Sequence, residues 1–248
     1  SSGQIRVCRT LQEVLNCLRT GVLAVVIHFE GAEQIAPDLS DLDNWYDRGL
    51  RSLGLVWARP NAFGHGVPLN TVGSPDTGPG LTDAGRVLVQ ACDERGILID
   101  LSHLNERGFW DVAELSRRPL VVTHSGAQGV YPSARNLTDR QLDAVRDSGG
   151  IVGLSLNVSD LCPEGSAGPD IPLDLPVRHI TYMAEWMGVD HVGLGCDLDG
   201  CTIPCAIGDA SGLPKLVSAL VDKGWRPEDV QKFAWGNWVR VLGTAWSH

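Results

Sequence analysis

The chain lacks several features that would mark particular classes of protein. It has no run of about 18 uninterrupted apolar residues, the length a helix needs to cross a bilayer, so no membrane segment is expected. It does not open with a charged segment followed by an apolar one, as a secretory signal does. Lysine and arginine number 20 against 30 acidic residues, for a net charge of −10, and they never cluster. Nucleic acid is therefore not an expected partner.

The cysteines lack both a C-x-x-C pair and regular spacing. They form an odd set that lies mostly in apolar runs: Cys8, Cys17, Cys92, Cys162, Cys196, Cys201 and Cys205. This pattern favours buried free thiols over a disulfide framework, and so a reducing, cytoplasmic location. A structural zinc site at the last three cysteines, which fall close together, is the alternative.

What the sequence does have is an α/β rhythm over residues 1–248, which we interpret as a single domain. With 43% apolar residues the chain can bury a large core. Short apolar, β-branched runs alternate with amphipathic stretches of helical period. Six strands are predicted, at residues 22–29, 53–57, 97–101, 120–123, 151–156 and 191–196. They are apolar on both faces, as parallel strands covered by helices are.

The segments between these strands carry helix start and stop signals. Thr82 can cap a helix that stops at Gly96, and Thr138 with Gln141 has the spacing of a capping box. Pro227 suits the first turn of the last helix. Two long loops, 60–80 and 162–172, interrupt the rhythm, and long loops after barrel strands usually build the site.

Four ionisable residues each follow an apolar run, where a barrel strand would emerge: Glu30, His103, His124 and Asp197. Because the carboxyl ends of barrel strands all lie at one face of the barrel, these four side chains should lie close to one another. Imidazole and carboxylate are the ligands of zinc-type ions. Each residue alone has an ordinary alternative, a core or loop histidine or a turn aspartate, and we interpret His28 as a core histidine.

The spacing refines these candidates. His103 and His124 lie 21 residues apart, about the length of one strand-helix-strand unit. They should therefore lie at the carboxyl ends of adjacent strands, close enough to bind the same ion. Glu30 ends a strand predicted to be buried, where a carboxylate needs a cation or several donors. Asp197 and Asp199 would face the same way in an extended segment, and Asp197 is the better acid/base candidate. Arg135 could clamp a carboxylate or form a surface ion pair.

Taken together, ordered segments over nearly the whole chain resemble the membrane (renal) dipeptidase family of the amidohydrolase superfamily. They are residues 30–33 (EGAE), 80–85 (GLTDAG), 100–103 (DLSH), 123–125 (THS), 135–139 (RNLTD) and 195–200 (GCDLDG). Residues 57–68 (WARPNAFGHGVP) look most like the bacterial branch.

The resemblance implies a (β/α)8 TIM-type barrel and a metallo-dipeptidase. It implies that Glu30 bridges two zinc-type ions, that His103 and His124 complete the shell of one, and that Asp197 is the acid/base residue. Arg135 would hold the C-terminal carboxylate of the dipeptide substrate. A homodimer is a further expectation.

Two departures from the family pattern qualify this expectation. No His-x-Asp pair precedes Glu30, and six strands are found where a closed barrel needs eight. We therefore expect that the first two βα units are absent from this chain. The complete family site should hold two zinc ions, with one or none as the alternative for this chain. Well-known animal members of the family also place a histidine where Trp57 stands, to polarise the substrate carbonyl. Trp57, Arg59 or His65 must take that role here if any residue does, and a structural role for each is the alternative.

Two other functions remain open at this point. One is a catalytically silent relative that binds a single ion or small ligand through Glu30, His103 and His124. The other is a barrel amidohydrolase that acts on lactones or cyclic amides.

Overall fold

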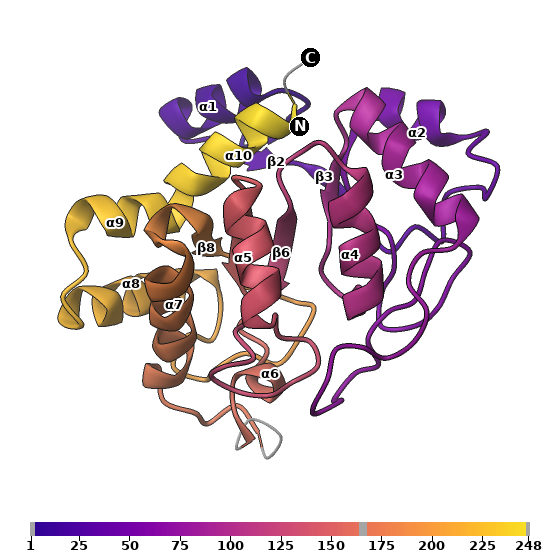
Figure 1. Ribbon diagram of the computed structural model, residues 1–248. Coiled ribbons are helices and arrows are strands. Elements are labelled where there is room, and N and C mark those ends of the chain that lie inside the picture. The colour runs from indigo at the N-terminus through magenta and orange to yellow at the C-terminus, as the bar shows by residue number, and fades with distance from the viewer. Residues whose placement is uncertain (1–2, 164–167, 247–248) are drawn as a thin grey trace. The chain divides into compact units, whose positions relative to one another are not determined.

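The computed structural model describes residues 3–163 and 168–246, in which helices follow strands along most of the chain (Figure 1). The main sheet has the strand order β3-β4-β5-β6-β7-β8. Its strands are β3 Ile27–Glu30, β4 Leu50–Gly54, β5 Leu98–Asp100, β6 Val121–Ser125, β7 Ile151–Leu154 and β8 Val192–Leu194. Parallel strands kept in chain order are the wall of a β/α barrel, so the predicted fold class is confirmed.

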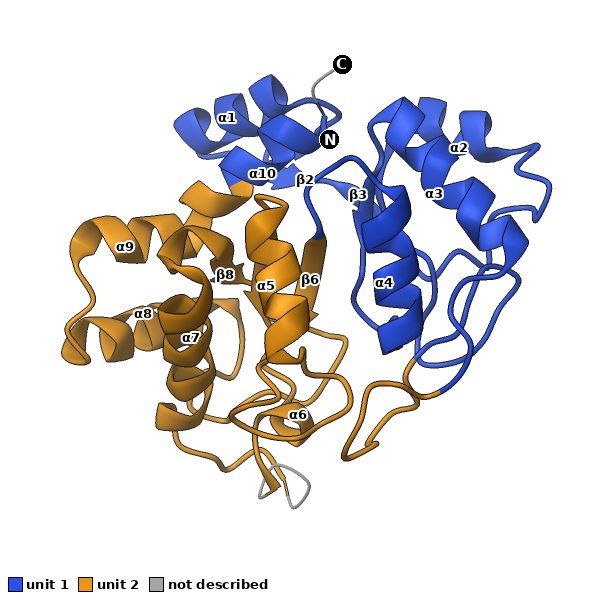
Figure 2. Cartoon of the chain, viewed as in Figure 1, with its two compact units in different colours: residues 1–66, 78–120, 239–248 blue, residues 67–77, 121–238 orange. Residues whose placement is uncertain are grey.

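The described chain divides into two compact units (Figure 2). Unit 1 comprises residues 1–66, 78–120 and 239–248. It contains β3, β4 and β5 and a separate parallel pair of strands, β1 Ile5–Val7 and β2 Leu23–Val25. Its helices include α1 Leu11–Thr20, α2 Leu42–Arg48, α3 Asp83–Arg95 and α4 Glu106–Leu115. Helix α3 packs against both α4 and β5.

Unit 2 comprises residues 67–77 and 121–238. Besides β6, β7 and β8 it contains α5 Asp139–Asp147, α6 Val158–Leu161, α7 Asp174–Met187, η2 Val189–His191, η3 Ala210–Gly212, α8 Leu213–Asp222, α9 Pro227–Gln231 and η4 Lys232–Gly236. Every residue of β7 is buried, and α7 covers β7 and β8. Two-sided burial explains the continuous apolar run in that strand.

The predicted caps of α3 and α5 are confirmed. Thr82 accepts the Gly85 N–H, and Gly96 ends α3 with a φ of 65°, the left-handed conformation that glycine adopts readily. Thr138 and Gln141 cap α5 reciprocally. Pro227 opens α9, with Glu228 in its first turn. However, α9 is not the last helix, because a π-helical turn leads from it into α10, Asn237–Ala245.

Some strand bounds differ from the prediction. The run 22–29 is split into β2 and β3, which belong to different sheets, and the short strand β1 was not predicted. Only residues 53 and 54 of the run 53–57 belong to a strand, because β4 begins at Leu50 and ends at Gly54. Of the loop 162–172, residues 164–167 lie outside the described part of the chain.

Four of the seven thiols are buried as predicted: Cys8, Cys17, Cys92 and Cys162. Burial raises the pKa of Cys92 to about 12, so this thiol is neutral at physiological pH. Cys205 is exposed, and Cys196 and Cys201 are half-buried. In the described residues no helix has both the length and the apolar character that a bilayer crossing requires.

Candidate metal centre

Glu30 and His103 form the best-defined part of the candidate site. Glu30 is the last residue of β3, and His103 follows β5 by three residues. The Nε2 atom of His103 lies 2.8 Å from Oε1 of Glu30. The imidazole is 6% exposed and the carboxylate side chain 42%. This carboxylate oxygen and this imidazole nitrogen are close enough to be two ligands of the same metal ion.

The turn after β5 gives His103 its position. His103 has a φ of 67°, in the left-handed region that histidine enters more readily than most residues. The buried carboxylate of Asp100 accepts the Ser102 N–H at 3.0 Å, and Leu104 N–H donates to Leu101 O at 3.2 Å. These two hydrogen bonds hold the backbone on both sides of His103, so the imidazole is presented from a fixed turn.

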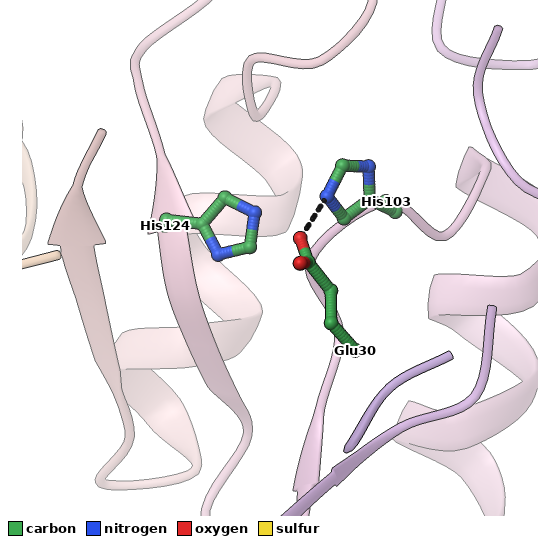
Figure 3. A group of neighbouring side chains, drawn as sticks. All are labelled: Glu30, His103 and His124. Atoms are coloured by element: carbon green, nitrogen blue, oxygen red, sulfur yellow. Dashed lines mark hydrogen bonds and ion pairs between the residues drawn. The ribbon is translucent and has the colours of Figure 1, made fainter. Parts of the chain in front are cut away.

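His124 lies within β6, one residue before its end, and is 8% exposed. Its Nδ1 is 2.9 Å from Oγ1 of Thr123. One ligand atom from each of Glu30, His103 and His124 lies within 4.8 Å of the other two (Figure 3). Strands β5 and β6 are neighbours in the sheet order, as the spacing of the two histidines predicted.

The chemistry of this donor set fits a zinc-type ion. Such ions bind neutral imidazole nitrogen and carboxylate oxygen, and catalytic sites commonly use three protein ligands. Glu30, His103 and His124 are the residues that would hold the ion. One premise of the prediction was wrong: Glu30 is not buried, and its exposed fraction means that no buried charge requires a cation there.

His28 lies two residues before Glu30 on β3 and faces other polar groups. Its Nδ1 is 2.8 Å from Oγ of Ser52, and its Nε2 is 3.7 Å from Oδ2 of Asp100. Sequence reasoning did not identify Ser52 or Asp100, although both belong to strands adjacent in the sheet. Period-two alternation along β4 and β5 is the signal that could have located them.

Asp197 follows β8 in a tight turn, not in the extended segment that was predicted. Asp197 and Asp199 have φ values of 55° and 69°, so side-chain alternation does not apply to them. A Cβ atom on Gly200 would collide with the Asp197 carboxylate, which would have to move to make room for it. Burial and the Asp197 charge raise the pKa of the Cys201 thiol, whose Sγ lies 3.3 Å from Asp197 O.

Arg135 is 8% exposed, so it is not the surface residue that was the alternative interpretation. Its guanidinium donates to His124 O at 3.4 Å, and its own carbonyl oxygen accepts from Ser125 Oγ at 2.8 Å. These two hydrogen bonds link Arg135 to β6, the strand that contains His124.

Arg59 and His65 have contacts of their own. Arg59 is 64% exposed, with Nε 3.7 Å from Glu33 Oε1 and the guanidinium 5.5 Å from the centre of the Trp57 ring. His65 Nδ1 is 3.0 Å from Gly80 O. A substrate contact by either residue stays a prediction.

Comparison with known proteins places this chain in one family. A family model described as membrane dipeptidase (peptidase family M19) matches residues 1–247. An uncharacterised Klebsiella pneumoniae protein encoded 5′ of pqqA is 45% identical over 246 residues, which are 99% of this chain and 91% of that protein.

Two solved structures match throughout. A structure described as dipeptidase AC, an M19 metallopeptidase, superposes with a TM-score of 0.97 at 48% identity, over 100% of this chain and 73% of that one. A metallopeptidase from Rhodobacter sphaeroides, liganded with a phosphinate mimic of L-Ala-D-Ala, gives 0.97 at 48% identity over 99% and 70%. The family match over nearly all residues and these metallopeptidase neighbours imply a metal-dependent hydrolase. The chain belongs to the membrane dipeptidase family, peptidase family M19.

Proposed function

We propose that this chain hydrolyses dipeptides with a zinc-type ion held by Glu30, His103 and His124. The observation that carries the proposal is the approach of three suitable ligand atoms to within 4.8 Å of one another in a member of a metallopeptidase family. A bound ion of this kind lowers the pKa of water from 15.7 toward about 7, which supplies hydroxide at neutral pH.

The remaining roles fall to two other residues of the chain. We assign Asp197 as the group that takes a proton from the attacking water and returns it to the leaving amine, because it follows the end of β8. Arg135 would hold the C-terminal carboxylate of the substrate, since a guanidinium can donate two parallel hydrogen bonds to a carboxylate. This contact would fix the peptide carbonyl relative to the metal ligands and so contribute orientation.

Dipeptides are the first substrates to test. The Rhodobacter sphaeroides relative is liganded with a mimic of L-Ala-D-Ala. We therefore propose that this chain accepts dipeptides with a D-residue at the C-terminal position. The free thiols favour a reducing compartment, and we extend the proposal to a cytoplasmic homodimer. Light scattering of the purified protein would test the dimer.

Replacement of Arg135 tests the carboxylate contact. We expect Arg135→Met to raise KM for free dipeptides by roughly 10- to 100-fold, because a charge-assisted hydrogen-bonded pair is lost. KM for the C-terminally amidated dipeptides should change little. The matched control is Arg140→Met, which removes an exposed arginine of α5. Equal effects of Arg135→Met on free and amidated substrates would contradict the assignment.

A further inference from the structure

Asp160 is a carboxylate that is 7% exposed, on the short helix α6 after β7. Both of its oxygens accept hydrogen bonds. Ser133 Oγ donates to Oδ1 at 2.6 Å, and Asn157 Nδ2 donates to Oδ2 at 2.8 Å. Its backbone oxygen also accepts, from Asn136 Nδ2 at 2.7 Å. A buried carboxylate needs such donors. Asn157 lies three residues away, whereas Ser133 and Asn136 belong to a segment 24 to 27 residues away along the chain.

The two partners of Asp160 in that segment are Ser133 and Asn136, which flank Arg135. Ser133 Oγ accepts the Arg135 N–H at 3.2 Å while it donates to Asp160. Asn136 N–H donates to Ser133 O at 3.0 Å, which closes the turn around Arg135. The backbone that carries Arg135 is therefore tied to the Asp160 carboxylate through one hydroxyl and to the Asp160 carbonyl through one amide.

The same turn is packed closely against its surroundings. A Cβ atom on Gly126 would lie 2.5 Å from Asn136 Oδ1 and 2.9 Å from His179 Nδ1, so any larger residue there would displace one of these side chains. His179 accepts the Ala127 N–H at Nδ1 and contacts Leu161 O through Nε2, each at 3.0 Å. Leu161 is the residue after Asp160, so α7 supports both α6 and the segment after β6.

We infer that Asp160 is a positioning residue that fixes the 133–136 turn so that Arg135 is held ready for the substrate carboxylate. This inference rests on the proposed function, in which Arg135 makes that contact. An arginine side chain is flexible, and holding its backbone in advance reduces the ordering required on binding. Asp160 itself does not touch the substrate in this account.

The test is a double-mutant cycle in the zinc-loaded chain. Asp160→Asn should raise KM for free dipeptides about tenfold, with kcat little changed and KM for amidated dipeptides unchanged. In the Arg135→Met background the same change should raise KM less than about twofold, because the group it acts through is gone. Asp222→Asn, at an exposed carboxylate of α8, is the matched charge control and should have no effect.

Ser133→Ala keeps the carboxylate and removes one hydrogen bond, so it should show a smaller effect on free dipeptides alone. It also keeps the inference testable if Asp160→Asn does not fold. Loss of activity on free and amidated substrates alike, or additive effects in the cycle, would overturn the inference while the Arg135 contact stands. If Arg135→Met itself leaves KM unchanged, both the contact and the inference are overturned.

Discussion

At the scale of single residues, His179 is an imidazole whose protonation state follows from its contacts. It is fully buried in α7 and accepts the Ala127 N–H at Nδ1, so its proton must be on Nε2, which donates to Leu161 O. Burial lowers the pKa of His179 to about 4, from an ordinary value of 6.5. The folded chain therefore holds the neutral ring at all but acidic pH.

This shift predicts a loss of stability in acid. The unfolded chain binds a proton at His179 near pH 6.5, whereas the folded chain does so only near pH 4. Stability from this group is thus complete above pH 6.5 and falls as the pH drops toward 4, by up to about 3 kcal/mol. Urea unfolding from pH 7.5 to 4 should show this loss in the wild type and a flatter profile in His179→Gln. Parallel profiles would contradict the assignment.

The candidate metal ligands could be predicted from sequence because each follows an apolar run. Glu30, His103 and His124 follow from the rule that parallel strand ends face one edge of the sheet, together with the ligand types that zinc-type ions prefer and the spacing of the two histidines. Asp160 could not be found in this way, because its role depends on hydrogen bonds to Ser133 and Asn136 that no local pattern encodes.

At the scale of elements, the capping box of α5 begins three residues after Arg135 and fixes where the chain turns into the helix. Gln141 N–H donates to Thr138 Oγ1 at 3.3 Å, and Thr138 N–H donates to Gln141 Oε1 at 2.9 Å. These bonds satisfy two backbone donors that have no partner within the helix.

Thr138→Ala should lower the free energy of unfolding by about 1 kcal/mol, because the cap of the Gln141 N–H is lost. Thr138→Ser keeps the hydroxyl and should lie close to the wild type in the same urea titration. If the alanine and serine variants unfold alike, the cap does not contribute to stability.

The elements that sequence predicted best are those with local end signals, such as α3 between Thr82 and Gly96. The elements predicted worst lie where tertiary pairing decides. The run 22–29 is continuous in apolar character, but the backbone leaves one sheet at Val25 and enters another at Ile27. A single apolar run does not indicate which strand each of its halves will pair with.

At the scale of the whole molecule, the proposed metal site is built from ligands that are distant in sequence. Glu30 and His124 lie 94 positions apart in the sequence, and both belong to strands of the main sheet. The fold class followed from the β/α rhythm and the ordered motifs. The turn geometry of Asp197 and the exposure of Glu30 did not, since both depend on the local three-dimensional surroundings.

Whether Glu30, His103 and His124 bind a metal ion is measured by equilibrium dialysis against zinc, after treatment of the purified protein with a chelator. The wild type should bind at least one ion per chain. The variants Glu30→Gln, His103→Asn and His124→Asn should each bind at least about tenfold more weakly, because each removes a ligand. His191→Asn, at a histidine whose Nδ1 is 2.9 Å from Gly150 O, is the control and should bind as the wild type. Zinc affinity unchanged in all three ligand variants would contradict the account.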